Sequence, residues 1–72
     1  MILHLSAAIC IAIAGTAGAI SIGMLGSKSV ESIARQPEAS SEIRTTMILA
    51  IAFIEATVLY ALVVSFIILF SE

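Results

Sequence analysis

The sequence predicts an all-α membrane protein in which two transmembrane helices form a hairpin that oligomerises into a ring. Hydrophobic residues make up 61% of the 72 residues and charged residues only 11%, and the charges cluster in the middle of the chain. A chain of this size with one cysteine has no disulfides to stabilise a soluble core, and it has too few charges to cover a soluble surface. The net charge of −2 leaves no basic patch, so no nucleic acid partner is expected.

Two apolar segments, residues 3–25 and 47–70, flank the charged middle of the chain. Each is longer than the roughly 20 residues with which a helix crosses about 30 Å of hydrocarbon. Only helices and closed barrels satisfy their backbone hydrogen bonds in lipid, and two segments without alternating polarity cannot close a barrel. We therefore expect a single hairpin over residues 1–72, with a first helix over 3–33, a polar loop over 34–37 and a second helix over 38–70.

The polar loop indicates how the hairpin is oriented. All three basic residues, Lys28, Arg35 and Arg44, lie in or beside it. The positive-inside rule then places the loop in the cytoplasm and both termini on the outer side, with a bacterial plasma membrane as the expected location. Pro37 pushes Gln36 out of the helical region and suits the first position of the second helix, so the turn should be short.

Small residues of the first segment form two stripes, about 160° apart on a helical wheel. Small faces allow helix backbones to approach closely, and two opposed faces provide for two neighbours, as in a row of copies that closes into a ring. The alternative is that Gly and Ala are simply common in membrane helices. The first stripe comprises Ala8, Ala12, Gly15, Ala19, Gly23 and Gly26, and the second comprises Cys10, Ala14, Ala17 and Ser21.

Glu55 is the residue expected to carry chemistry. It lies nine residues into the second apolar segment, about 5 Å from the bilayer midplane at about 1.5 Å per residue. An ionised carboxylate there would cost several kcal/mol, and no Lys, Arg or His of this chain lies at a comparable depth. Glu55 must then be protonated or receive its counter-charge from another polypeptide, which makes it a reversible proton carrier. The alternative is a glutamate that only hydrogen-bonds a neighbouring helix.

Two motifs resemble the proteolipid, or c subunit, that forms the membrane ring of the rotary F-type ATP synthase. They are the loop residues Ala34 to Ala39, with the sequence A-R-Q-P-E-A, and Phe53 to Ala56, F-I-E-A, followed by Tyr60. The resemblance covers the whole chain. It implies a ring whose copies each carry one ion on a carboxyl and whose rotation couples proton flow to ATP synthesis. The chain would then be a transport protein and not an enzyme by itself, with no cofactor besides the transported proton.

The resemblance also implies roles for individual residues. Glu55 matches the ion-binding carboxylate, the backbone carbonyl of Phe53 the acceptor of the carboxyl proton, and Tyr60 the hydroxyl partner. Thr57 could return its hydroxyl to the carbonyl four residues before it or hold a water near Glu55, and the sequence leaves both open.

Partners are implied in the same way. Arg35, Gln36 and Pro37 match the loop that meets the gamma and epsilon subunits of the central stalk. Other expected partners are identical copies in the ring, membrane lipids, and the stator, which supplies a basic residue from its membrane-embedded a subunit. The family often has glycine at alternate positions of the first helix, where this chain has Ala17, Ala19, Ser21 and Gly23, so the number of copies in the ring is left open.

Two alternatives concern the transported ion and the class of protein. Sodium-dependent members of the family have a Gln and a Ser where this chain has Ile22 and Ala56, so a proton is expected and a sodium-coupled ring is the alternative. The other alternative is a small pore-forming or holin-like hairpin, in which Glu55 would line a water-filled lesion. Such a pore former would not need the Arg35-Gln36-Pro37 turn.

Overall fold

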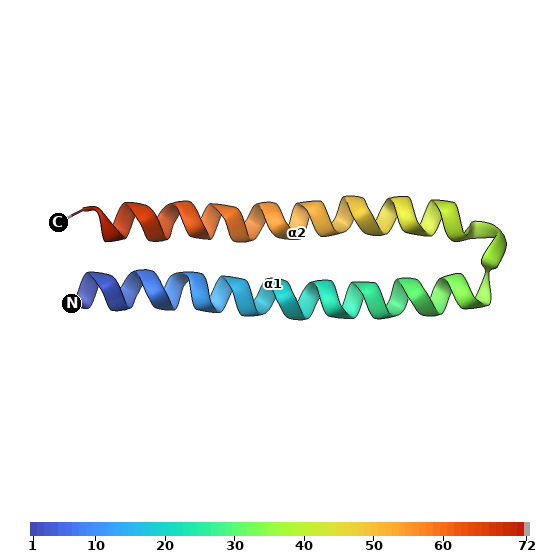
Figure 1. Cartoon of the computed structure of the whole chain (residues 1–72), viewed down its shortest axis with the longest axis horizontal. Coiled ribbons are helices and arrows are strands. Elements are labelled where there is room, and N and C mark those ends of the chain that lie inside the picture. The colour runs from blue at the N-terminus through green and yellow to red at the C-terminus, as the bar shows by residue number, and fades with distance from the viewer. Residues whose placement is uncertain (72) are drawn as a thin grey trace.

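The computed structural model describes residues 1–71 and shows two long antiparallel helices joined by a tight turn (Figure 1). Helix α1 spans Ile2–Arg35, a single 3-10 turn η1 spans Pro37–Ala39, and helix α2 spans Ser40–Leu69. The two termini lie together at one end of the hairpin and the turn lies at the other (Figure 1). Residue 72, the last of the expected hairpin, is outside the described range.

The turn differs in detail from the expected loop over 34–37. Helix α1 continues to Arg35, and the amide of Gln36 still donates to the Ser32 carbonyl at 2.9 Å. Gln36 then leaves the helical region, with φ −132° and ψ 70°, because the ring of Pro37 disfavours that region for the residue before it. Pro37 begins the 3-10 turn, and α2 proper starts at Ser40 instead of residue 38.

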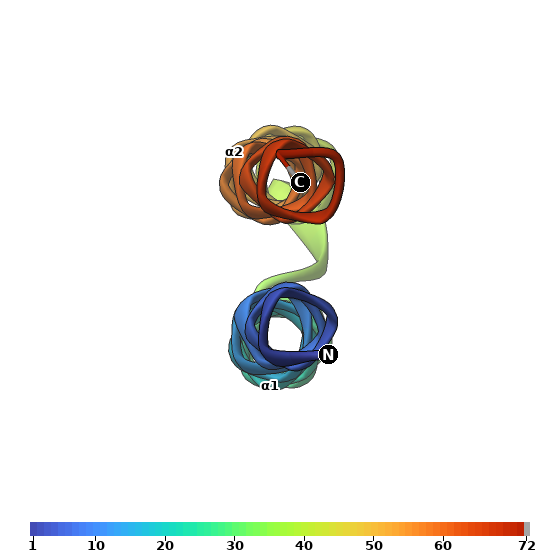
Figure 2. The same ribbon diagram turned by 90° about the vertical axis from the view of Figure 1, so that its left-hand side faces the viewer.

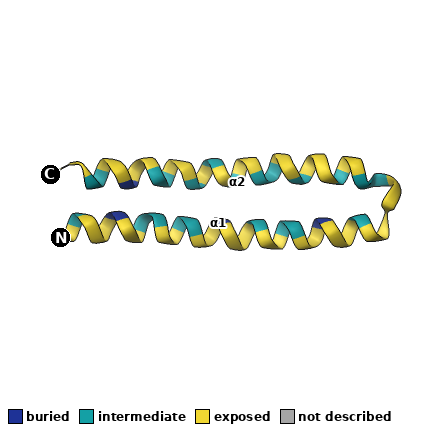
Figure 3. Ribbon diagram, in the orientation of Figure 1, coloured by how far each residue is buried: buried dark blue, intermediate teal, exposed yellow. Residues whose placement is uncertain are grey.

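The hairpin is a single layer, and its two flanks are open. Its Cα atoms extend over 55 × 15 × 7 Å, and the end-on view shows one helix above the other with nothing on either side (Figure 2). Within residues 1–71 only Ala7, Gly18, Ser29 and Ser65 are buried (Figure 3). Both helices are long and apolar enough to cross a membrane, and almost none of their apolar length is covered by the hairpin itself. Lipid or further protein chains must cover these surfaces.

Three contacts fix the register between the helices. Gly18 lies so close to α2 that a Cβ atom there would be 2.6 Å from Val58 Cγ2 and 3.7 Å from Ile54 Cγ2. Nearer the termini, the Ser65 hydroxyl donates to the Ala7 carbonyl at 3.1 Å, and the Cys10 thiol donates weakly to the Ala61 carbonyl at 3.7 Å. Close packing around small residues and interhelical hydrogen bonds are what hold helices together in lipid. Gly18 lies between the two small stripes, so neither stripe predicted this contact.

Replacing Gly18 by alanine should weaken the contact between α1 and α2, because the added methyl group would overlap the Val58 side chain. Overpacking of this kind costs about 1 to 3 kcal/mol. The measurement is the thermal transition of the detergent-solubilised protein, followed by circular dichroism. Val58→Ala in the same background removes the clashing methyl groups and should restore part of the loss. An unchanged transition for Gly18→Ala would contradict the close approach.

Candidate ion-binding site

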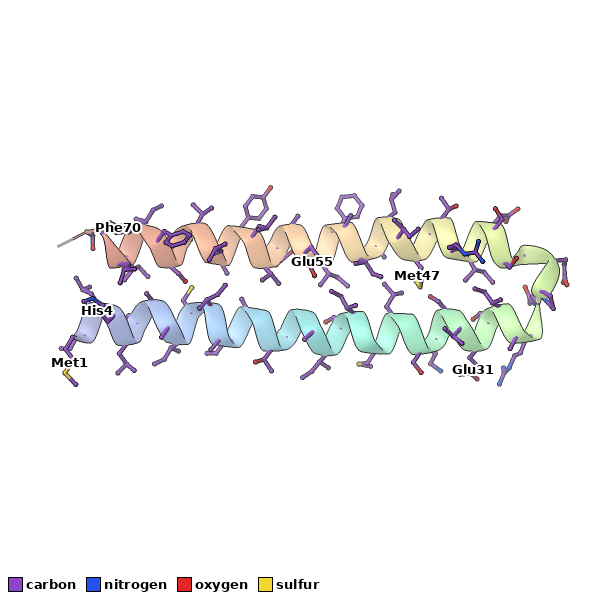
Figure 4. The ribbon with its side chains drawn as sticks, in the orientation of Figure 1. Met1, His4, Glu31, Met47, Glu55 and Phe70 are labelled. Carbon is purple, nitrogen blue, oxygen red and sulfur yellow. The ribbon has the colours of Figure 1, made fainter. Side chains whose placement is uncertain are left out.

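Glu55 lies near the middle of α2 and is exposed (Figure 4). Ile54 and Val58 mark the side of α2 that contacts α1. On a helical wheel with about 100° per residue, Glu55 lies about 80° from the direction midway between Ile54 and Val58. Within residues 1–71 Glu55 takes part in no side-chain hydrogen bond or ion pair. The hairpin alone therefore gives this carboxyl no partner.

The other expected site residues lie on the opposite flank of α2. Thr57 and Phe53 are each two residues from Glu55, and so about 160° away around the helix, and Tyr60 is about 140° away. The Phe53 and Tyr60 side chains are 69% and 73% exposed. The structure thus brings neither the Phe53 carbonyl nor the Tyr60 hydroxyl to the Glu55 of the same hairpin.

Thr57 makes the first of the two interactions that the sequence left open. Its hydroxyl donates to the Phe53 carbonyl at 3.2 Å. This side-chain bond back to the preceding turn is common for threonine in membrane helices. The Thr57 oxygen keeps its capacity to accept a hydrogen bond, but its proton is committed to the carbonyl.

A cavity of about 280 Å³ opens on the same side as Thr57. It is lined by Ala14, Ala17, Gly18 and Ser21 of α1 and by Ile54, Thr57 and Val58 of α2. The second small stripe of α1 therefore lies on the same side of the hairpin as Thr57, and we call this side the Thr57 flank. The opposite side, which carries Glu55, is the Glu55 flank.

The first small stripe faces the Glu55 flank and is not explained by the hairpin. Around the axis of α1, the first stripe lies about 60 to 140° from Gly18 in one direction. The second stripe lies about 40 to 100° from Gly18 in the other direction. A Cβ atom added at Gly15, Gly23 or Gly26 would meet nothing within 4 Å. Their small size serves no contact with α2, and it leaves room for a helix outside the hairpin to approach α1 closely on this flank.

The loop residues lie at the tip of the hairpin. Arg35, Gln36 and Pro37 are all exposed. The Arg35 guanidinium donates to the Glu31 carboxylate at 2.8 Å, one helical turn away. An exposed pair of this kind is worth at most about 1 kcal/mol, so it leaves Arg35 available to a partner.

The family model for the C subunit of ATP synthase matches residues 5–68 of the chain. The chain belongs to the family of ATP synthase c subunits. Among its relatives, the ATP synthase c subunit of Latilactobacillus sakei subsp. sakei is 46% identical over 67 residues, which cover 93% of this chain and 96% of the relative. The c subunit of Syntrophomonas wolfei subsp. wolfei is 42% identical over 62 residues, 86% of either chain. That of a Synechococcus strain is 43% identical over 68 residues, 94% of this chain and 84% of the relative.

Membership of the c-subunit family confirms the predicted family and the membrane hairpin. The c subunit is the ion-translocating component of the membrane sector of F-type ATP synthase, and it is not catalytic itself. The family assignment supports this function over that of a pore-forming hairpin.

The open small stripe leads to a prediction about assembly. Gly15→Leu or Ala19→Leu should prevent copies from associating, because a branched side chain would stand where two backbones approach closely. Ile13→Leu and Ile20→Leu, on the exposed side of α1 away from α2, are the matched controls and should be mild. The yield of assembled rings on a denaturing gel measures the effect. Equal yields for both sets of variants would show that the small stripe is not needed for assembly.

Proposed function

We propose that copies of this chain stand side by side in a membrane ring and that Glu55 of each copy carries one proton at its contact with the next copy. One observation carries the proposal: Glu55 lies on one flank of α2, and Phe53, Thr57 and Tyr60 lie on the other, all within about 8 Å of its depth. Identical hairpins placed side by side in one orientation bring the Glu55 flank of one copy against the Thr57 flank of the next. Such a head-to-tail contact repeats from copy to copy and closes as a ring.

The contact between copies would complete the site that a single hairpin leaves open. A protonated carboxyl donates one hydrogen bond through its O–H and accepts others at its carbonyl oxygen. Acceptors for the Glu55 proton on the next copy are the Phe53 carbonyl and the hydroxyl oxygens of Thr57 and Tyr60. With such partners the neutral carboxyl is stable in hydrocarbon, whereas the ionised form would be costly there.

Release of the proton requires a positive charge from another protein. The apolar stretches 5–27 and 45–71 contain no Lys, Arg or His. We therefore propose that a basic residue of the stator, on its a subunit, faces each Glu55 in turn and stabilises its ionised form. Each copy would then lose its proton to one aqueous side and regain one from the other as the ring turns, which couples proton flow to rotation.

Glu55→Gln should abolish proton transport and leave the ring assembled, because the amide keeps the shape and hydrogen bonding of the carboxyl but cannot release a proton. The measurement is proton-driven ATP synthesis in vesicles that contain the complete enzyme with a ring of variant chains. Ring yield on a gel controls for assembly. Variant rings that still drive ATP synthesis would refute the role of Glu55.

The exposed tip is proposed to dock the gamma and epsilon subunits of the central stalk on the cytoplasmic side of a bacterial plasma membrane. The three basic residues at this end support the orientation. Substituting Arg35 or Gln36 should uncouple ATP chemistry from proton flow, because these side chains lie far from Glu55 along the hairpin. Rings should still form, and membranes stripped of the soluble sector should still conduct protons. Loss of that conduction in the Arg35 or Gln36 variants would place these residues in the ion path and contradict the proposal.

The proposed ion is the proton, because the chain offers few ligands for a metal cation. Sodium needs several oxygen ligands to replace its water, and Ile22 and Ala56 supply hydrocarbon. Carbodiimide, which reacts with protonated carboxyls, should label Glu55 at a rate that depends on pH and not on sodium. The measurement is labelling at fixed pH with tens of millimolar sodium or potassium chloride. Protection by sodium alone would establish the sodium-coupled alternative.

A further inference from the structure

We propose that Ser21 is a further residue of the ion-binding site and that its hydroxyl donates a hydrogen bond to the Glu55 carboxyl of the neighbouring copy. The inference rests on the proposed function, because it requires the Glu55 flank of one copy to meet the Thr57 flank of the next. It gives Ser21, one residue of the second small stripe, a role beyond close packing.

A protonated carboxyl both donates and accepts hydrogen bonds. Its carbonyl oxygen needs a donor as well as an acceptor for its proton. On the Thr57 flank the Phe53 carbonyl can only accept, and the Thr57 hydroxyl already donates to that carbonyl at 3.2 Å. Tyr60 also carries a hydroxyl, but it lies about 8 Å farther from the turn than Glu55 along α2, whereas Ser21 lines the cavity beside Thr57. Ser21 takes part in no side-chain hydrogen bond within residues 1–71, so its proton is free. A hydroxyl without a partner in hydrocarbon is itself unfavourable, so Ser21 gains from the contact as Glu55 does.

The shape of the Thr57 flank also favours Ser21 as a partner of Glu55. Ser21 and Thr57 are the two hydroxyl residues lining the cavity of about 280 Å³, and the rest of the lining is hydrocarbon. Ala14, Ala17 and Gly18 leave the hollow because they have little or no side chain. A carboxyl group that enters from the next copy would fill the hollow and meet its two polar groups.

The depth of Ser21 along the hairpin also favours a contact with Glu55 of the next copy. The Ser65–Ala7, Cys10–Ala61 and Gly18–Val58 contacts set the register, which places Ser21 level with a point between residues 50 and 55 of α2. Ser21 is therefore at most about 8 Å nearer the turn than Glu55, at about 1.5 Å per residue. Helical side chains lean toward the N-terminus of their own helix, so in this antiparallel pair Glu55 leans toward the turn and Ser21 leans away from it. The two side chains approach each other in height.

The test is the infrared spectrum of purified rings. The difference between rings of the unmodified chain and Glu55→Gln rings identifies the C=O stretching band of the protonated Glu55. Ser21→Ala should shift this band to higher wavenumber, because the carbonyl loses a donor. It should also raise the rate of carbodiimide labelling about two- to tenfold, as expected for one hydrogen bond. Ser21→Thr keeps the hydroxyl and should retain the original band position.

Two further variants complete the experiment. Ser65→Ala removes a hydroxyl that bonds within the hairpin, and it should leave the Glu55 band in place. If Ser21→Ala rings are too unstable to purify, Ser21→Cys keeps the side-chain size with a weak donor and should give the same shift to a smaller extent. An unmoved band and an unchanged labelling rate would overturn the role of Ser21. If Glu55→Gln rings are inactive in that case, the proton-carrying role of Glu55 stands without Ser21, whereas active Glu55→Gln rings would refute the proposed function itself.

Discussion

A carboxyl group in hydrocarbon needs hydrogen-bonding partners or a counter-charge, and a hairpin one layer thick supplies neither to Glu55 within residues 1–71. Only two helices are present in residues 1–71, and the side of α2 that faces α1 is occupied by apolar packing around Gly18. Glu55 is turned about 80° away from that side and stands on an open flank. The monomer therefore leaves the Glu55 carboxyl without a partner, and another molecule would have to supply its hydrogen bonds or its counter-charge.

The same constraint explains the unusual distribution of small residues. Of the four glycines, only Gly18 needs to lack a side chain for the contact within the hairpin. A Cβ atom at Gly15, Gly23 or Gly26 would meet no atom within 4 Å. A Cβ atom at any of these three positions would be compatible with the contact between α1 and α2. A helix that stays small on both of its free sides can accommodate identical neighbours on both sides. In the proposed ring these neighbours would bring the polar groups of one copy to the carboxyl of the next.

Much of this could be predicted from the sequence, because charge clustering, segment length and a lone intramembrane carboxyl are local features. The hairpin follows from them. The short turn follows from Pro37 after Gln36, and the c-subunit family follows from the resemblance of the loop motif and of the residues around Glu55. Gly18 could not be singled out, since its importance depends on how α1 is rotated against α2, which no stripe in one helix reveals. The separation of Glu55 from Phe53 and Tyr60 follows from helical spacing alone, but that spacing becomes meaningful only once Ile54 and Val58 are known to face α1.

The turn has a mechanical consequence. Between Ile2 and Leu69, Gln36 alone lies outside helical backbone, so few soft dihedral angles separate the two helices at the tip. Helix α1 also runs on for ten residues beyond the apolar segment that ends at Leu25, which lifts the tip about 15 Å out of the hydrocarbon. With so few free dihedral angles, the tip is expected to deform little relative to the two helices. In the proposed ring, a force applied at the depth of Glu55 would therefore reach the tip with little bending at the turn.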